Sequence, residues 1–123
     1  MLHKTSVDIT TDSSGDATVY LGSALRGHLV ALKYAPGTIA TGGDLTITGE
    51  TSGTPILTVT NAGTSNAFWY PRAPANKVAD NSAITDSAEL IPIVRERIKV
   101  VVAQGGATKS GSIEAIYETD PPY

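Results

Sequence analysis

The residue types that most often bind metals are few in this chain and are poorly spaced for it. The only histidines are His3 and His28, which lack the paired spacing that places two imidazoles on one ion. Asp12 and Asp16 flank a Ser-Ser-Gly turn, but their spacing does not match the alternating oxygen ligands of a calcium loop. The chain has no cysteine, which excludes disulfides and thiolate chemistry. The sequence therefore predicts no metal and no other cofactor.

Catalytic groups do not form a recognisable pattern either. Residues 105–110 end in Lys-Ser as a phosphate-binding loop does, but Thr108 stands where that motif requires glycine. Serines are numerous, yet none lies in a Gly-x-Ser-x-Gly elbow between a strand and a helix. A carboxylate pair drawn from Asp80, Asp86 and Glu89 would be needed for a sugar hydrolase. We interpret these three residues as part of a solvated loop and predict that the protein is not an enzyme.

One stretch gathers the residue types that dominate protein interfaces. Residues 68–72 contain the only phenylalanine and the only tryptophan, together with a tyrosine, a proline and an arginine. Alternation along a strand places Phe68 and Tyr70 on one face and Trp69 on the other, so one face packs in the core and the other is free for a partner. Charged and terminal residues add further candidates. The predicted interface residues are Trp69, Tyr70, Pro71, Arg72, Arg95, Arg97, Leu2, His3, Pro122 and Tyr123.

Composition and charge narrow the class of partner. The net charge is −3, and the 9 basic residues are scattered among 12 acidic ones, so no basic face for nucleic acid is predicted. No apolar stretch is long enough to span a bilayer, and residues 1–6 lack the apolar core of a secretory signal. We therefore expect neither nucleic acid nor a membrane as partner.

The elements that would position these residues are strands. Alternating runs at residues 4–10 and 17–21 flank a polar turn and predict a hairpin. The apolar run within residues 27–34 predicts a strand in the middle of a sheet. Residues 45–48 and 57–60 share the pattern apolar, Thr, apolar, Thr, which predicts a second hairpin with one core face and one threonine face.

The remaining segments complete one domain over residues 1–123. Residues 72–89 are expected to form a long loop, with a short helix at residues 84–90, and residues 119–123 a C-terminal tail. The short spacing of the strands predicts an all-β, antiparallel β-sandwich or jelly-roll-like barrel of about eight strands. Further strands are predicted at residues 67–70, 89–94, 97–104 and 112–118.

Four runs carry a wider resemblance: residues 7–17 (VDITTDSSGDA), 43–50 (GDLTITGE), 69–72 (WYPR) and 97–106 (RIKVVVAQGG). Together they resemble a family of small virion proteins encoded in the structural regions of tailed-phage and prophage genomes. The resemblance covers most of the chain, and its motifs are structural, so it assigns no functional residue. It implies a capsid decoration (cement) protein with a jelly-roll-like fold on the outer capsid surface, assembled in the bacterial host cytoplasm.

The partners that follow from this resemblance are the major capsid protein and further copies of the chain. A homotrimer is the preferred oligomer, because multivalent binding to a symmetric lattice raises avidity. Two other functions stay open from the sequence. One is a tail, fibre or head-to-tail connector module of the virion, and the other is a carbohydrate-binding β-sandwich with Trp69 or Tyr70 as its stacking platform.

Overall fold

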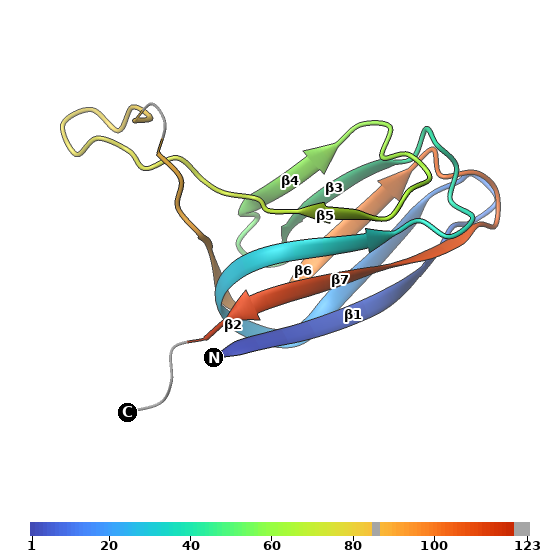
Figure 1. Ribbon diagram of the computed structural model, residues 1–123, viewed down its shortest axis with the longest axis horizontal. Coiled ribbons are helices and arrows are strands. Elements are labelled where there is room, and N and C mark those ends of the chain that lie inside the picture. Colours follow the sequence, from blue (N-terminus) through green and yellow to red (C-terminus); the bar gives the residue numbers. More distant parts are fainter. Residues whose placement is uncertain (85–86, 120–123) are drawn as a thin grey trace.

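A computed structural model describes residues 1–84 and 87–119, which form an all-β domain with no helix in the part described (Figure 1). Seven strands join in one antiparallel sheet in the order β1-β7-β2-β6-β3-β4, and β5 also pairs with β2. The predicted antiparallel all-β class is therefore confirmed. The strands are β1 (Leu2–Thr10), β2 (Ala17–Ala35), β3 (Asp44–Gly49), β4 (Pro55–Val59), β5 (Ala67–Trp69), β6 (Ile91–Ala103) and β7 (Ser110–Glu118).

β2 is the strand that gives the sheet its shape. It is 19 residues long, its first part pairs with β6, and its last part pairs with β7 and β5. Between these parts it bends, as Figure 1 shows, with Gly22 at φ +75° and Gly27 at φ +113°. A Cβ at position 27 would collide with the carbonyl oxygen of Glu118, so the close approach of β7 requires glycine there. The two strands predicted at residues 17–21 and 27–34 are thus one bent strand.

The hairpin predicted between residues 4–10 and 17–21 is wrong. β1 pairs with β7 from Leu2 opposite Glu118 to Thr10 opposite Ser110. The reason lies at the end of β1, where the buried Thr11 hydroxyl donates to the Gly106 carbonyl at 2.6 Å and its backbone N–H donates to the Lys109 carbonyl. Alternation fixed which face of β1 is buried, but these long-range bonds select its neighbour.

The second hairpin is confirmed. β3 and β4 pair with Leu45 opposite Val59 and Ile47 opposite Leu57. Leu45 and Ile47 are buried, whereas the side chains of Thr46 and Thr58 on the other face are exposed. The other edge of β3 pairs with β6, which places this hairpin beside the apolar run at residues 100–103.

β6 spans both segments predicted as strands at residues 89–94 and 97–104. Its inward positions are odd-numbered up to Ile93 and even-numbered from Glu96 onwards. The change occurs at Arg95, which has φ +52° and is skipped in the pairing of Leu25 with Glu96 and Arg26 with Val94. This β-bulge keeps both halves of β6 facing one core.

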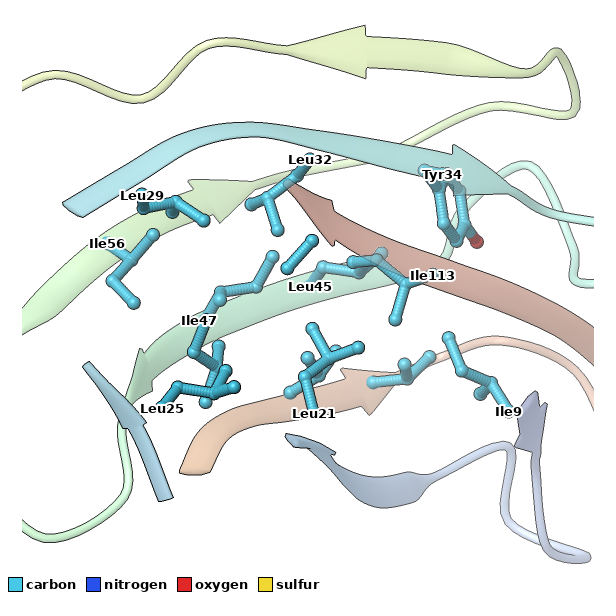
Figure 2. Close-up of a cluster of buried hydrophobic side chains, with 14 of the residues drawn as sticks. Ile9, Leu21, Leu25, Leu29, Leu32, Tyr34, Leu45, Ile47, Ile56 and Ile113 are labelled. Carbon is cyan, nitrogen blue, oxygen red and sulfur yellow. The ribbon is translucent and has the colours of Figure 1, made fainter. Parts of the chain in front are cut away.

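The core contains side chains from both parts of the bent sheet (Figure 2). The largest fully buried side chains are Tyr34, Ile9, Leu21, Leu29, Leu32, Ile39, Leu45, Ile47, Ile98, Ile113, Val100 and Val102. Most are aliphatic or β-branched, which suits close packing on a pleated surface.

Residues 72–89, called the extension below, leave the body of the domain between β5 and β6 (Figure 1). The extension is not an unstructured loop, because Ala73 and Glu89 exchange backbone hydrogen bonds at 2.9 and 2.7 Å. The helix predicted at residues 84–90 is absent from the described residues of that segment. Pro122 and Tyr123, and residues 120–123 of the predicted tail as a whole, lie outside the described residues.

Candidate functional site

The outer face of β5 carries the most exposed aromatic surface in the described chain. Phe68 is 56% exposed and Tyr70, one residue after β5, is 63% exposed. The ammonium group of Lys33 on β2 lies 5.7 Å from the centroid of the Phe68 ring, within range of a cation–π interaction. We call Phe68 and Tyr70 the aromatic edge.

Trp69 points the other way and packs against the core. Its ring stacks on Tyr34 with a centroid distance of 5.3 Å and an interplanar angle of 19°. The alternation predicted for residues 68–70 is therefore observed, and it gives Trp69 a packing role rather than the interface role that we assigned to it. The half-buried position also removes Trp69 as a sugar-stacking platform.

The two residues after Tyr70 hold the start of the extension in place. Pro71 is buried, so it offers no contact surface, contrary to its place among the interface candidates. Arg72 is exposed, and its Nη1 donates to the carbonyl oxygens of Val30 at 2.9 Å and Pro71 at 2.8 Å. Arg72 thereby ties the base of the extension to β2.

The extension consists of two segments that run side by side and meet at an exposed tip. The Lys77 N–H donates to the Ser82 carbonyl at 2.8 Å, and the Ile84 N–H donates to the Ala75 carbonyl at 2.8 Å. Val78 lies in the turn that the bond between Lys77 and Ser82 closes, and it is fully exposed. The extension therefore presents an apolar side chain at its far end.

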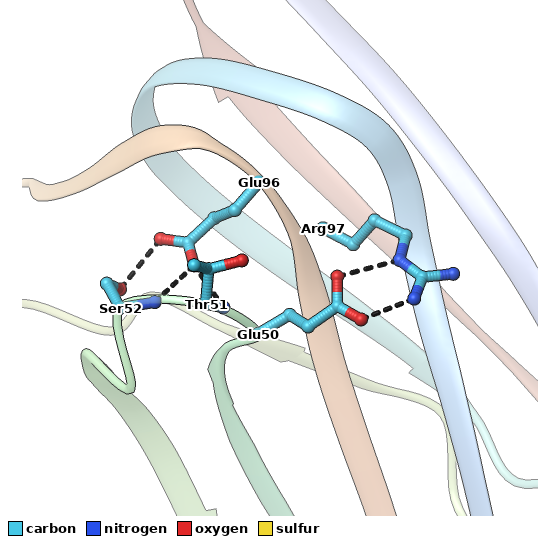
Figure 3. Close-up of polar contacts among 5 residues, drawn as sticks. All are labelled: Glu50, Thr51, Ser52, Glu96 and Arg97. Atoms are coloured by element: carbon cyan, nitrogen blue, oxygen red, sulfur yellow. Dashed lines mark hydrogen bonds and ion pairs between the residues drawn. The ribbon is translucent and has the colours of Figure 1, made fainter.

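The arginines of β6 differ in what they contact. Arg95 is exposed at the bulge, where it stays available to a partner. Arg97 is engaged within the chain. Its Nε donates to Glu50 Oε1 at 2.8 Å, and its Nη2 also contacts Glu50 (Figure 3). Its guanidinium also lies 4.0 Å from the centroid of the Tyr20 ring. These bonds lower the pKa of Glu50 and raise that of Arg97. Arg97, an interface candidate from the sequence, is therefore engaged within the chain, although its side chain remains 41% exposed.

Beside this pair, Glu96 is a buried carboxylate that the sequence did not reveal. It is 4% exposed and accepts hydrogen bonds from the Thr51 N–H at 2.7 Å, the Ser52 N–H at 2.8 Å and the Ser52 hydroxyl at 2.7 Å (Figure 3). Burial raises the pKa of Glu96, but these hydrogen bonds outweigh it and the net pKa is lowered. Glu96 closes the turn between β3 and β4. The only sequence feature that could have indicated the burial of Glu96 is its position as a charged residue within an apolar strand. The bulge at Arg95 is the reason that its side chain points inward.

The N-terminal candidates lie at the start of β1. Leu2 is 63% exposed, in keeping with a contact residue. His3 is half-buried, its ring stacks on Tyr117 at 5.2 Å, and its Nε2 lies 3.0 Å from the Thr119 hydroxyl. His3 therefore helps to fix the end of β7, and Leu2 is the more accessible of the two.

A shallow cavity of about 490 Å³, lined by both polar and apolar groups, opens where β1, β7 and the end of β2 meet. Asp8, Thr10, Asn66, Ser110 and Ser112 contribute side chains to its lining. Its hydroxyl, amide and carboxylate groups are suited to hydrogen bonds with a polar ligand.

Side chains that bind metal ions are not clustered in the described part of the chain. No cluster of three or more His, Asp or Glu side chains suited to a metal ion occurs among residues 1–84 and 87–119. Asp80 lies in the extension, where hydrogen bonds from the Ser82 hydroxyl and N–H lower its pKa, the opposite of what a general acid needs. Asp86 lies outside the described residues. Within the same ranges, no helix is long and apolar enough to cross a membrane.

Comparison with known proteins found no matching family model, no matching curated protein and no matching solved structure.

Proposed function

We propose that this protein is a structural component of a tailed-phage particle, a capsid decoration protein that binds the major capsid protein and stabilises the shell. The observation that carries this proposal is the exposed apolar surface of the aromatic edge, and Val78 adds a separate exposed apolar side chain at the tip of the extension. The phage assignment comes from the sequence runs at residues 7–17, 43–50, 69–72 and 97–106. The exposed surface supports the part of the proposal that concerns binding to protein.

The size of the exposed rings favours protein contact. An aromatic side chain buries roughly 150–250 Å² when fully enclosed, at about 25 cal/mol per Å². Because Phe68 and Tyr70 are more than half exposed, covering the rest of either ring would contribute roughly 2–3 kcal/mol. Two such residues beside Arg72 resemble the centre of an interface hot spot.

The scaffold behind the aromatic edge is suited to a repeated, static contact. β5 is held on β2, and β2 is in turn paired with both β6 and β7. A rigid patch loses little conformational entropy on binding. Occupation of many equivalent sites on a capsid would then stabilise the shell by mass action.

The proposal is tested on particles of the phage or prophage that encodes the chain. Quantitative mass spectrometry of purified particles should give a copy number close to that of the major capsid protein. A low copy number would instead indicate a tail, fibre or connector module, because tail parts are far fewer than capsid subunits. Absence from the particles would refute the virion role altogether.

A matched pair of variants tests the surface. The double substitution Phe68→Ala with Tyr70→Ala should abolish binding of the purified protein to capsids that lack it. Thr46→Ala with Thr58→Ala alters the exposed face of the β3–β4 hairpin and should leave binding unchanged. Equal binding by both variants would remove the aromatic edge from the interface.

The cavity at β1 and β7 favours a second candidate function, which is binding of a carbohydrate. Asp8, Asn66 and Ser112 line the cavity, and Ser112 lies opposite Asp8 in the sheet. An exposed ring, Phe68 or Tyr70, would provide the stacking surface that sugars favour. A glycan array probed with the wild type and with Asp8→Ala decides this, because only a sugar site in the cavity loses signal in the variant.

A further inference from the structure

The outer edge of β1 is a long strand edge without a partner in the described part of the chain. β1 stands at one end of the strand order and its strand pairing is only with β7, although β1 also lies close to β2. It is 9 residues long and contains no proline and no register shift. The other terminal strands are protected, since β4 has 5 residues, begins at Pro55 and carries a register shift, and β5 has only 3 residues. Exposed strand edges of this kind pair readily with another chain.

The hydrogen bonds to β7 show which groups of β1 face this open edge. The Thr119 N–H donates to the Met1 carbonyl at 3.0 Å, and the Thr11 N–H donates to the Lys109 carbonyl at 2.8 Å. Odd-numbered residues therefore point their backbone groups at β7. Because successive residues in a strand alternate, the even-numbered residues point theirs outward. These residues are Leu2, Lys4, Ser6, Asp8 and Thr10, and all five also have exposed side chains.

The charges on these five residues make the edge complementary to itself. In an antiparallel pair centred on Ser6, Lys4 of one copy lies opposite Asp8 of the other, and the same contact occurs twice. A pair centred on Lys4 or on Asp8 would place like charges opposite each other, which destabilises a sheet. Only the register centred on Ser6 places opposite charges directly across from each other, and this favours it over the other registers that the open edge permits.

We propose that two copies of this protein associate edge to edge through β1, with Ser6 opposite Ser6 and Lys4 opposite Asp8. The contact is isologous and produces a two-fold dimer, in place of the trimer that the resemblance implies. Leu2 then lies opposite Thr10, so its exposed side chain is partly covered. The β1 contact describes how the chain self-associates, and only this self-association rests on the proposed function. Capsid binding uses a different surface, the aromatic edge.

The first experiment measures the mass of the full chain by sedimentation velocity over a range of concentrations. A monomer–dimer equilibrium is expected for the wild type. Ser6→Pro removes an N–H that faces outward and not toward β7, so it should block association while leaving the β1–β7 ladder intact. Ser6→Ala keeps that N–H and should dimerise as the wild type does. A wild type that stays monomeric, or forms trimers unaffected by Ser6→Pro, would overturn the proposal.

A charge swap tests the register and does not depend on the proline variant folding. Lys4→Asp and Asp8→Lys should each weaken the dimer by about tenfold or more, because each brings like charges together twice. The combined variant restores opposite charges and should dimerise like the wild type. Failure of the combined variant to recover, with a circular dichroism spectrum like that of the wild type, would refute this register. Measuring capsid binding by Ser6→Pro distinguishes the dimer proposal from the capsid-binding proposal. If only the dimer is lost, this variant should still bind capsids, with reduced avidity.

Discussion

Glu96 provides a sharp test of how the β3–β4 turn is held on β6, because this one buried carboxylate accepts three hydrogen bonds from the turn. We consider the substitution Glu96→Gln, which preserves the shape of the side chain and removes its charge. The glutamine oxygen can still accept from the Thr51 and Ser52 N–H groups, and its amide can donate to the Ser52 hydroxyl. The change therefore isolates the contribution of the ionised form.

The expected loss follows from the number of bonds and their surroundings. A hydrogen bond to an ionised acceptor contributes about 1.5–3 kcal/mol, and one between neutral groups roughly half of that. Thr51 and Ser52 are themselves exposed, so water can accept some of the hydrogen bonds that these residues donate to Glu96. We expect Glu96→Gln to lower the free energy of unfolding by about 1–2 kcal/mol, and Glu96→Ala, which loses all three bonds, by about 3 kcal/mol.

The effect must depend on pH with a definite sign. The pKa of Glu96 is lower in the folded protein than its ordinary value of 4.5. A carboxylate of this kind stabilises the fold fully above its unfolded pKa, and this stabilisation is lost as the pH falls through the folded pKa. The difference in stability between the wild type and Glu96→Gln should therefore be constant near neutral pH and shrink below pH 4.5.

Urea denaturation followed by tryptophan fluorescence measures both quantities, because the single tryptophan, Trp69, stacks on the buried Tyr34 and reports loss of the core. Glu89→Gln is the matched control, since it removes an exposed carboxylate from the extension and should change stability by less than about 0.5 kcal/mol. A Glu96→Gln variant as stable as this control at neutral pH would refute the argument. So would a stability difference that persists unchanged at about pH 3.

Three further substitutions test other parts of the structure. The buried Tyr34 hydroxyl has no hydrogen-bond partner among the described residues, so Tyr34→Phe should leave the thermal unfolding midpoint unchanged or raise it. Gly27→Ala forces a Cβ against the Glu118 carbonyl at φ +113°, and we expect a loss of about 2 kcal/mol or more in urea denaturation. Arg97→Ala should give a small loss that shrinks as salt is raised, because the ion pair with Glu50 is solvent-exposed; a loss independent of salt would contradict this.

The sequence predicted the faces of the strands better than their neighbours. Leu45 and Ile47 on β3, and Ile113 on β7, are buried as alternation requires. Alternation says nothing about which strand lies alongside, and the nearest run in sequence was the wrong partner for β1. Long-range bonds such as those of the Thr11 hydroxyl decide that choice, and no local pattern reveals them.

The bulges account for most of what the sequence could not predict about the candidate site. Strict alternation of inward and outward residues fails in β6 at Arg95, because Val94 and Arg95 both face outward. That single irregularity turns Glu96 inward and leaves Arg97 beside Glu50. The aromatic stretch was easier to interpret, because β5 is short and regular, and only the assignment of its two faces to core and solvent had to come from the structure.

The two proposed contacts can be made at the same time. β1 and β5 lie on opposite sides of the β7–β2 pair, so roughly three strand spacings, or about 14 Å, separate the open edge from the aromatic edge. A partner on Phe68 and Tyr70 therefore leaves Lys4 and Asp8 free for a second copy. If both contacts form, the dimer presents two aromatic edges related by a two-fold axis, and binding to a lattice becomes bivalent. Loss of either edge should then weaken capsid binding, with loss of the aromatic edge abolishing it and loss of the β1 edge reducing only its avidity.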